Sequence, residues 1–109
     1  MKIDFNSIEE KRNPGFKGGE GTAVLKIYTD STIKVIKGYL EKDSSIGMHT
    51  HDDSSETVYI LSGSGKMIYD GEEEVLTAGD VSYCPKGHTH SLVNTGEEPL
   101  WFLGVVPTL

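Results

Sequence analysis

The chain has 109 residues, of which 36% are hydrophobic and 25% charged, and its formal net charge is −7. This length fits one domain, and the composition argues against wholesale disorder. Seventeen acidic residues against ten lysines and arginines leave no basic surface for nucleic-acid phosphates and no basic amphipathic helix for an anionic membrane. No apolar run approaches the roughly 20 residues that span a bilayer, and the amino terminus lacks the apolar segment of a secretory signal. We therefore expect a cytoplasmic protein that binds neither nucleic acid nor membranes.

Residues 1–21 have the weakest pattern in the chain. Asn13-Pro14-Gly15 would interrupt any helix, and three further glycines follow before Thr22. The segment FKGGEG, residues 16–21, does not match a phosphate-binding loop, because no Gly-Lys-Ser/Thr sequence follows it. We expect residues 1–21 to form an N-terminal arm that packs against a sheet edge or exchanges between subunits.

From Thr22 onward the pattern is that of short β-strands. Nine runs rich in β-branched and aromatic residues are separated by turn residues: 23–28, 33–40, 46–51, 56–61, 66–69, 73–76, 81–84, 88–93 and 100–106. Asp70-Gly71 is the strongest hairpin signal, and the three glutamates after it are expected at a solvated hairpin edge. Short strands with regular turns predict an all-β protein, either a sandwich or a closed barrel, because both architectures limit exposed strand edges.

Cys84 is the only cysteine, so the chain has no intramolecular disulfide. It ends a predicted strand just before Pro85, where a small buried residue is expected. The alternative is a nucleophile that is activated by His88 or His90, if either lies close in space.

All four histidines lie in two His-Thr-His sequences. Side chains alternate along a strand, so His49 and His51 point to the same face, about 6.6 Å apart. The polar turn after His51 would let the chain reverse and bring Glu56 opposite this pair, and a later strand would deliver His90. Three imidazole nitrogens and one carboxylate oxygen suit one divalent transition metal ion (Mn, Fe, Co, Ni, Cu or Zn), and an octahedral ion would keep two positions open. A single histidine is more often a hydrogen-bonded core residue, but the joint arrangement favours a metal site.

The residues of this region resemble the two signature motifs of the cupin superfamily. HTHDDSSETVYILSG, residues 49–63, has the form HxHx4Ex6G, and GDVSYCPKGHTHSLVN, residues 79–94, has the form Gx5PxGx2Hx3N. The first motif departs at its start, where Asp43 replaces the expected glycine, which affects a loop and no ligand position. The resemblance implies a double-stranded β-helix, or jelly-roll, antiparallel barrel over residues 22–109.

Carried over to this chain, the resemblance implies that four residues bind the metal ion: His49, His51, Glu56 and His90. Asn94 is expected to brace a hairpin. His88, two residues before His90, is a candidate catalytic acid or base, with an exposed loop histidine as the alternative. An apolar wall around the site is typical of a small-molecule pocket, and the candidates for this wall are Val58, Ile60, Tyr83 and Leu92. Tyr83 and other aromatic side chains of the strands would line either this pocket or a dimer interface.

Two functions remain open on the sequence alone. The first is a metal-dependent enzyme, of isomerase, dioxygenase or lyase type, that acts on a small polar molecule at the open metal positions. The second is a non-catalytic module that binds or senses a small ligand through its metal. The only arginine, Arg12, lies outside the motifs. Lys34, Lys66 or Lys86 would have to replace it as an anion clamp, and no motif places any of them at the site, so anionic ligands are disfavoured.

The expected partners are a small-molecule ligand and a second copy of the chain. The resemblance implies a homodimer that pairs through edge strands. The arm and residues 22–40 are the expected contact regions, because exposed strand edges otherwise invite aggregation.

Overall fold

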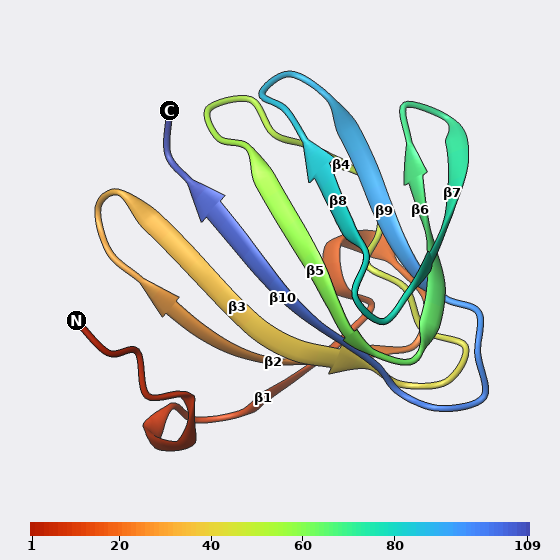
Figure 1. Ribbon diagram of the computed structural model, residues 1–109, viewed down its shortest axis with the longest axis horizontal. Coiled ribbons are helices and arrows are strands. Elements are labelled where there is room, and N and C mark those ends of the chain that lie inside the picture. The colour runs from red at the N-terminus through yellow and green to blue at the C-terminus, as the bar shows by residue number, and fades with distance from the viewer.

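The computed structural model describes residues 1–109 as two antiparallel sheets around one apolar core (Figure 1). The strands are β1 (Lys11–Pro14), β2 (Thr22–Thr29), β3 (Ile33–Leu40), β4 (His49–Thr50), β5 (Glu56–Ser62), β6 (Ser64–Tyr69), β7 (Glu72–Thr77), β8 (Val81–Cys84), β9 (Thr89–Asn94) and β10 (Leu100–Pro107), and the two short 3-10 helices are η1 (Phe5–Ser7) and η2 (Phe16–Gly18). The six-stranded sheet has the order β1-β2-β3-β10-β5-β8, and the four-stranded sheet has the order β4-β9-β6-β7. This jelly-roll arrangement confirms the predicted all-β fold. No helix is long and apolar enough to cross a membrane.

Alternate residues of both sheets fill the space between them. On β5, Val58 and Ile60 point inward and are 3% and 0% exposed, whereas Tyr59 between them points outward. The same alternation elsewhere gives a core of eleven buried side chains: Ala23, Leu25, Ile36, Leu40, Val58, Ile60, Met67, Leu76, Leu92, Leu100 and Phe102. Burial of this apolar surface stabilises the fold by roughly 25 cal/mol per Å². Because the core draws on both sheets, it also holds them in a fixed relative position.

Eight of the nine predicted strands are present, with ends shifted by at most two residues. The exception is residues 46–51, where only the two-residue strand β4 remains. Ile46 N–H still donates to the carbonyl oxygen of Leu92 on β9, at 2.8 Å, but Gly47 N–H donates to the carbonyl oxygen of Phe16 on η2, at 3.0 Å. The chain therefore leaves the sheet to contact η2 before it returns as β4.

The N-terminal residues pack along the six-stranded sheet. β1 pairs with β2 of the same chain, with Lys11 opposite Leu25. The following turn begins at Gly15, whose φ of 62° is left-handed and suits glycine. η2 then lies against the loop before β4, so closely that a Cβ on Gly47 would clash with the carbonyl oxygen of Lys17. The N-terminal part of the chain thus reaches the loop that leads into the first pair of histidines.

The β6–β7 hairpin turns at Asp70 and Gly71, as predicted. Both residues have positive φ angles, 47° and 84°, as a type I′ turn requires. Asp70 Oδ1 also accepts a hydrogen bond from the backbone N–H of Thr89 at 3.0 Å, which ties the turn to β9. The three glutamates after the turn are exposed, in agreement with a solvated hairpin edge.

Asn94 braces the connection between β9 and β10. The residue is 4% exposed. Its Nδ2 donates to three backbone carbonyl oxygens, those of Leu40, Glu41 and Glu98, at 3.0, 3.1 and 3.0 Å. Its Oδ1 accepts a hydrogen bond from the N–H of Gly96 at 3.0 Å. The side chain therefore has a structural role at this end of the barrel.

Asn94→Ala is expected to lower the free energy of unfolding by roughly 3 kcal/mol, because it leaves buried carbonyl groups without a partner. Urea denaturation followed by circular dichroism measures this change. Asn6→Ala, an exposed position on η1, is the control and should change stability by less than about 0.5 kcal/mol. An effect at Asn94 as small as the control would contradict the bracing role.

Candidate metal centre

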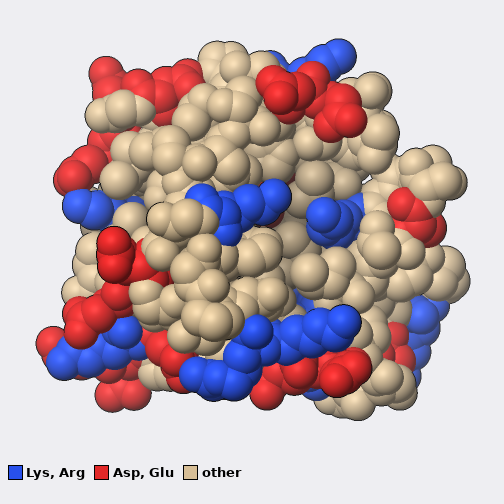
Figure 2. All heavy atoms as spheres, turned by 180° about the vertical axis from the view of Figure 1, so that it is seen from behind, with Lys and Arg blue, Asp and Glu red and all other residues tan.

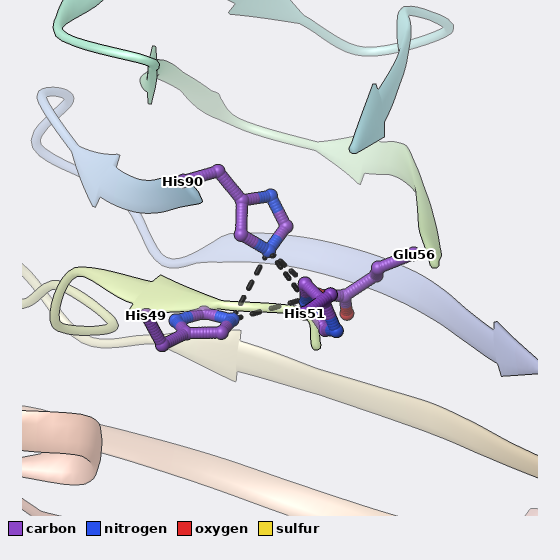
Figure 3. Close-up of side chains that lie close together, drawn as sticks. All are labelled: His49, His51, Glu56 and His90. Carbon is purple, nitrogen blue, oxygen red and sulfur yellow. Dashed lines mark hydrogen bonds and ion pairs between the residues drawn. The ribbon is translucent and has the colours of Figure 1, made fainter. Parts of the chain in front are cut away.

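Both sheets contribute to a cluster of the four predicted ligands (Figure 3). In the four-stranded sheet His49 on β4 lies directly opposite His90 on β9, and His51 follows β4. Glu56 is the first residue of β5, in the six-stranded sheet. One donor atom from each residue lies within 4.8 Å of all the others. Residues 52–55 therefore cross from one sheet to the other, instead of making the simple chain reversal expected from the sequence.

The spacing of the donor atoms fits one metal ion at ordinary bond lengths. His90 Nε2 lies 3.0 Å from Nε2 of both His49 and His51. Glu56 Oε1 lies 2.9 Å from His90 Nε2, 3.2 Å from His51 Nε2 and 3.8 Å from His49 Nε2. Ligands about 2.1 Å from an ion are roughly 3.0 Å apart at right angles and roughly 3.4 Å apart at tetrahedral angles. Four of these five distances match neighbouring positions of an octahedron, which would leave two positions for other ligands.

Hydrogen bonds on the far side of two imidazoles orient them. His49 Nδ1 lies 2.8 Å from the carbonyl oxygen of Gly47. A carbonyl oxygen only accepts, so neutral His49 carries its proton on Nδ1 and presents a lone pair at Nε2. His51 Nδ1 lies 2.8 Å from Ser54 Oγ, which can accept in the same way. Partners of this kind are typical of histidine metal ligands. The Nε2 lone pairs repel one another at these distances, and a cation between them would remove that repulsion.

Glu56 supplies the only negative charge of the cluster and is 8% exposed. Burial opposes its ionisation, but in the metal-free site the three imidazoles, whose Nε2 atoms donate to the carboxylate when they are protonated, outweigh burial and hold the pKa of Glu56 well below its usual range. Gly104 on β10 makes room for it, because a Cβ there would come within 2.8 Å of Glu56 Oε2. The carboxylate is therefore ionised at neutral pH and suited to a divalent cation.

Three of the four cluster residues, His90 being the exception, border a cavity of about 210 Å³. Most of its apolar wall comes from β2, β3 and β10, for example Leu25 and Phe102, and the rest from Phe16 on η2 and Ile46. Two lysines also border it, Lys17 on η2 and Lys34 on β3. A second cavity, of about 10 Å³, lies beside the cluster and has room for no more than one water molecule. Of the two, only the larger cavity therefore has room for a ligand of several atoms.

The predicted wall residues occupy three different environments. Val58 and Leu92 line the small cavity. Ile60 is 0% exposed in the core and lines neither cavity. Tyr83 is 57% exposed on the outer face of β8, because the next residue, Cys84, pairs with the first residue of β5 and is the one that faces inward. Only the register between β5 and β8 decides which face Tyr83 occupies.

His88 also lies outside both cavities. Its Nδ1 is 2.6 Å from Asp70 Oδ2 and 3.0 Å from the hydroxyl of Tyr69, and its ring stacks on that of Tyr69. The left-handed turn at Gly87, with a φ of 88°, redirects the chain before β9 begins, so His88 does not share the orientation of His90. This position argues against the catalytic role predicted for His88.

Two lysines at the cavity were not assigned to the site from the sequence. Lys17 lies in the glycine-rich part of the expected arm and has a left-handed φ of 56°. Lys34 was considered as an anion clamp but had no predicted position. Arg12, by contrast, pairs with Glu41 at 2.9 Å on the surface. Anionic ligands were disfavoured because no motif placed a lysine at the site, and the two lysines at the cavity remove this objection. The glycines of residues 15–21, which permit such turns, were the only feature of the sequence that could have indicated the position of Lys17.

Cys84 is 1% exposed, and burial, with the charge of Glu56 as a further cause, raises the pKa of its thiol to about 11. Thiolate is therefore scarce at mildly alkaline pH. We expect the native protein to react with a chromogenic disulfide reagent at least roughly tenfold more slowly than the urea-unfolded chain. Equal rates in the two states would show that the Cys84 thiol is accessible, and would favour the alternative that Cys84 is a nucleophile.

His51→Ala is expected to weaken metal binding by at least roughly 100-fold, because it removes one of three imidazole donors. Mass-spectrometric metal analysis after reconstitution with Mn(II) or Co(II) and dialysis should give one ion per wild-type chain. The metal should also raise the melting temperature of the wild-type protein, since it binds the native state. His88→Ala is the matched control and should keep its ion. A wild-type protein that retains no transition metal would contradict the site.

Comparison with known proteins agrees with this geometry. Residues 37–106 match the family model for the cupin domain. An oxalate-binding protein of Thermotoga maritima is 40% identical over 112 aligned residues, which cover 97% of this chain and 93% of that protein. The crystal structure of a predicted oxalate decarboxylase from Thermotoga maritima matches with a TM-score of 0.88 at 30% identity and covers 100% of both chains. An oxalate decarboxylase of Bacillus subtilis is 36% identical over 63 residues, 53% of this chain and 16% of that protein. With the jelly-roll fold and the two matched motifs, these similarities show that the chain belongs to the cupin family.

Proposed function

We propose that this cupin binds a small carboxylate ligand at a metal ion held by the four-residue cluster. The observation that carries the proposal is the charge around the cavity. Lys17 and Lys34 border it, and Glu56 is the only acidic residue that does. A bound divalent ion would supply a Lewis acid with open positions for the oxygen atoms of the ligand. The lysines would form ion pairs with carboxylate oxygen atoms of the ligand that do not contact the metal.

The balance of charges favours an anion with more than one negative charge. Imidazoles are neutral ligands, so a divalent ion together with Glu56 would carry one net positive charge. Lys17 and Lys34 add two more at the same cavity, in a chain whose overall charge is −7. Figure 2 shows basic side chains near the centre of one face, with most acidic side chains toward its rim. A dicarboxylate would offset this local excess, and attraction is stronger in a partly enclosed site than in bulk water.

The size of the cavity favours a ligand of few atoms. Its volume of about 210 Å³ is below the roughly 300–1,000 Å³ typical of sites for drug-sized ligands. The Thermotoga maritima relative that matches nearly the whole chain is named for oxalate binding, and oxalate is a two-carbon dianion. We therefore take oxalate as the first ligand to test, followed by other short dicarboxylates.

A metal-dependent enzyme on the same class of ligand is the second candidate. The name of the Bacillus subtilis relative, an oxalate decarboxylase, supports it. The cavity, however, has no tyrosine, carboxyl group or histidine outside the cluster, so only Lys17 and Lys34 are available to move a proton. Binding is therefore the function that the residues support best.

Lys34→Ala is expected to weaken oxalate binding to the Mn(II)-loaded protein roughly tenfold, or about 1.4 kcal/mol, because it removes a cation from the cavity. Isothermal titration calorimetry measures the dissociation constant. Lys37→Ala is the matched control, since it removes the same charge from the same strand but borders a different pocket, with Val24 and Trp101. It should change the dissociation constant less than about twofold.

Comparison ligands separate the possible outcomes. Acetate should bind more weakly than oxalate, and neutral ethylene glycol more weakly still, because they offer fewer charges to the lysines. Failure of the metal-loaded protein to bind any carboxylate would contradict the proposal. An equal loss of oxalate affinity in Lys34→Ala and Lys37→Ala would show that Lys34 does not contact the ligand. Consumption of oxalate with release of carbon dioxide would favour the enzyme instead.

A further inference from the structure

Phe16 and Lys17 begin η2 and border the cavity next to the metal cluster. The Phe16 side chain also packs against the apolar core. The Lys17 ammonium lies 5.7 Å from the centre of the Phe16 ring, within the range of a cation–π contact. The lysines that form ion pairs within the chain are Lys42 and Lys66. The charge of Lys17 is therefore available to a ligand in the cavity.

The backbone of Phe16 is connected to His49 through Gly47. The N–H of Gly47 donates to the carbonyl oxygen of Phe16 at 3.0 Å. The carbonyl oxygen of Gly47 lies 2.8 Å from His49 Nδ1 and accepts its proton, while Nε2 of the same ring faces the other cluster residues (Figure 3). Two consecutive hydrogen bonds at Gly47 thus join η2 to the imidazole ring of a candidate metal ligand.

Further contacts hold the segment after η2 against the same loop. Ser45 N–H donates to the carbonyl oxygen of Glu20 at 2.9 Å, and Glu20 N–H donates to Ser45 Oγ at 2.9 Å. A Cβ on Gly19 would overlap the carbonyl oxygen of Ser45 and come within 2.7 Å of the Gly47 nitrogen. Gly19 is extended, with a φ of −78°, so the close contact with the loop is what requires glycine there.

η2 has few contacts that would hold it in place without the loop. It has three residues, none of them buried, and its middle residue, Lys17, has a left-handed φ of 56°. A left-handed angle is unfavourable for a residue with a Cβ. Glycines at positions 15, 18, 19 and 21 also give the segment many alternative conformations. A ligand that contacts this segment would therefore reduce its conformational freedom.

We propose that η2 couples metal binding to anion binding, so that each ligand strengthens the binding of the other. A metal ion at Nε2 of His49 would fix the ring, and the two hydrogen bonds at Gly47 extend this restraint to Phe16. An anion paired with Lys17 would restrain the same turn from the cavity side. Each ligand would lower the entropy cost of ordering η2 for the other, and such coupling is reciprocal. The anion half of this coupling rests on the carboxylate-binding function proposed above.

Lys34 borders the same cavity but has no such connection to a metal ligand. It lies on β3, where Thr29 of β2 is opposite it on one side and Val106 of β10 on the other. Its backbone is therefore held by the sheet whether or not a ligand is present. Lys34 contributes charge alone, whereas Lys17 contributes charge and a connection to His49. The two lysines form a matched pair for an experiment.

The metal affinity of the anion-free protein tests the connection between η2 and His49. Gly19→Ala should weaken Zn(II) binding at least roughly tenfold, because its methyl group pushes η2 away from Gly47 and the loss of a group that orients a ligand has effects of this size. Competition with a chromogenic chelator measures the dissociation constant. Gly79→Ala is the matched control, since a φ of 95° strains an alanine there but its Cβ would meet nothing within 4 Å. Its metal affinity should stay within about twofold of the wild type.

Hydrogen exchange of the Gly47 amide, measured by NMR on the Zn(II)-loaded protein, tests the link to the anion. Saturating oxalate should slow this exchange at least roughly fivefold in the wild type. Lys17→Ala should abolish the effect, whereas Lys34→Ala should retain it at saturation. The internal control is the amide of Gly87, which donates to the carbonyl oxygen of His51 at 2.7 Å. It contacts a cluster residue without contacting η2, so its exchange should change less than about twofold.

Far-ultraviolet circular dichroism and metal content verify that each variant is folded and loaded. The coupling is supported if Gly19→Ala weakens metal binding more than Gly79→Ala does, and if only Lys17→Ala loses the effect of oxalate on the Gly47 amide. Wild-type metal affinity in folded Gly19→Ala overturns it.

Two further outcomes separate this coupling from the proposed function. If oxalate binds the wild type without slowing exchange at Gly47, or slows it equally in Lys17→Ala, the coupling is overturned and carboxylate binding stands. If no carboxylate binds the metal-loaded protein, both are overturned. The wild-type exchange measurement needs no substitution, so it decides the matter even where Gly19→Ala does not fold.

Discussion

The candidate metal site depends on the packing of the two sheets, which brings four donor atoms within 4.8 Å of one another. The cross-strand pair of His49 and His90 holds two donors within the four-stranded sheet, and Glu56 belongs to the other sheet. Neither sheet contains the set by itself, so the packing between the sheets determines the donor distances. A buried carboxylate and closely spaced lone pairs are unfavourable without compensation. The apolar core stabilises an arrangement that the site residues would not adopt on their own.

The glycine-rich N-terminal segment contacts the loop before the first cluster residue, His49, through backbone atoms. Gly47 N–H donates to the carbonyl oxygen of Phe16, and the carbonyl oxygen of Gly47 accepts from His49 Nδ1. A Cβ on Gly19 or on Gly47 would come within 2.7 Å of the backbone nitrogen of the other. The segment that brings Lys17 to the cavity therefore also supports the loop that orients a candidate metal ligand.

The two-residue period of a strand lets the six-stranded sheet present two different surfaces. On β10, Phe102 faces the cavity and Leu103 the outer side. On β3, Lys34 borders the cavity and Lys37 borders an outer pocket. Two lysines thus lie at the cavity on the inner side of the sheet, where Glu56 is the only acidic residue. One sheet therefore lines the cavity of the proposed ligand site with one face and is turned outward with the other.

The sequence by itself determined eight of the ten strands, the Asp70-Gly71 turn and the identity of the four clustered residues. These depend on local period, turn chemistry and short spacings, all of which are visible in the order of residues. The tertiary structure decided the rest. The register between β5 and β8 turned Tyr83 outward, the backbone turn at Gly87 moved His88 away from the cavity, and packing of η2 brought Lys17 to it. Each of these depends on contacts between segments distant in the chain or on a turn angle, which residue patterns do not encode.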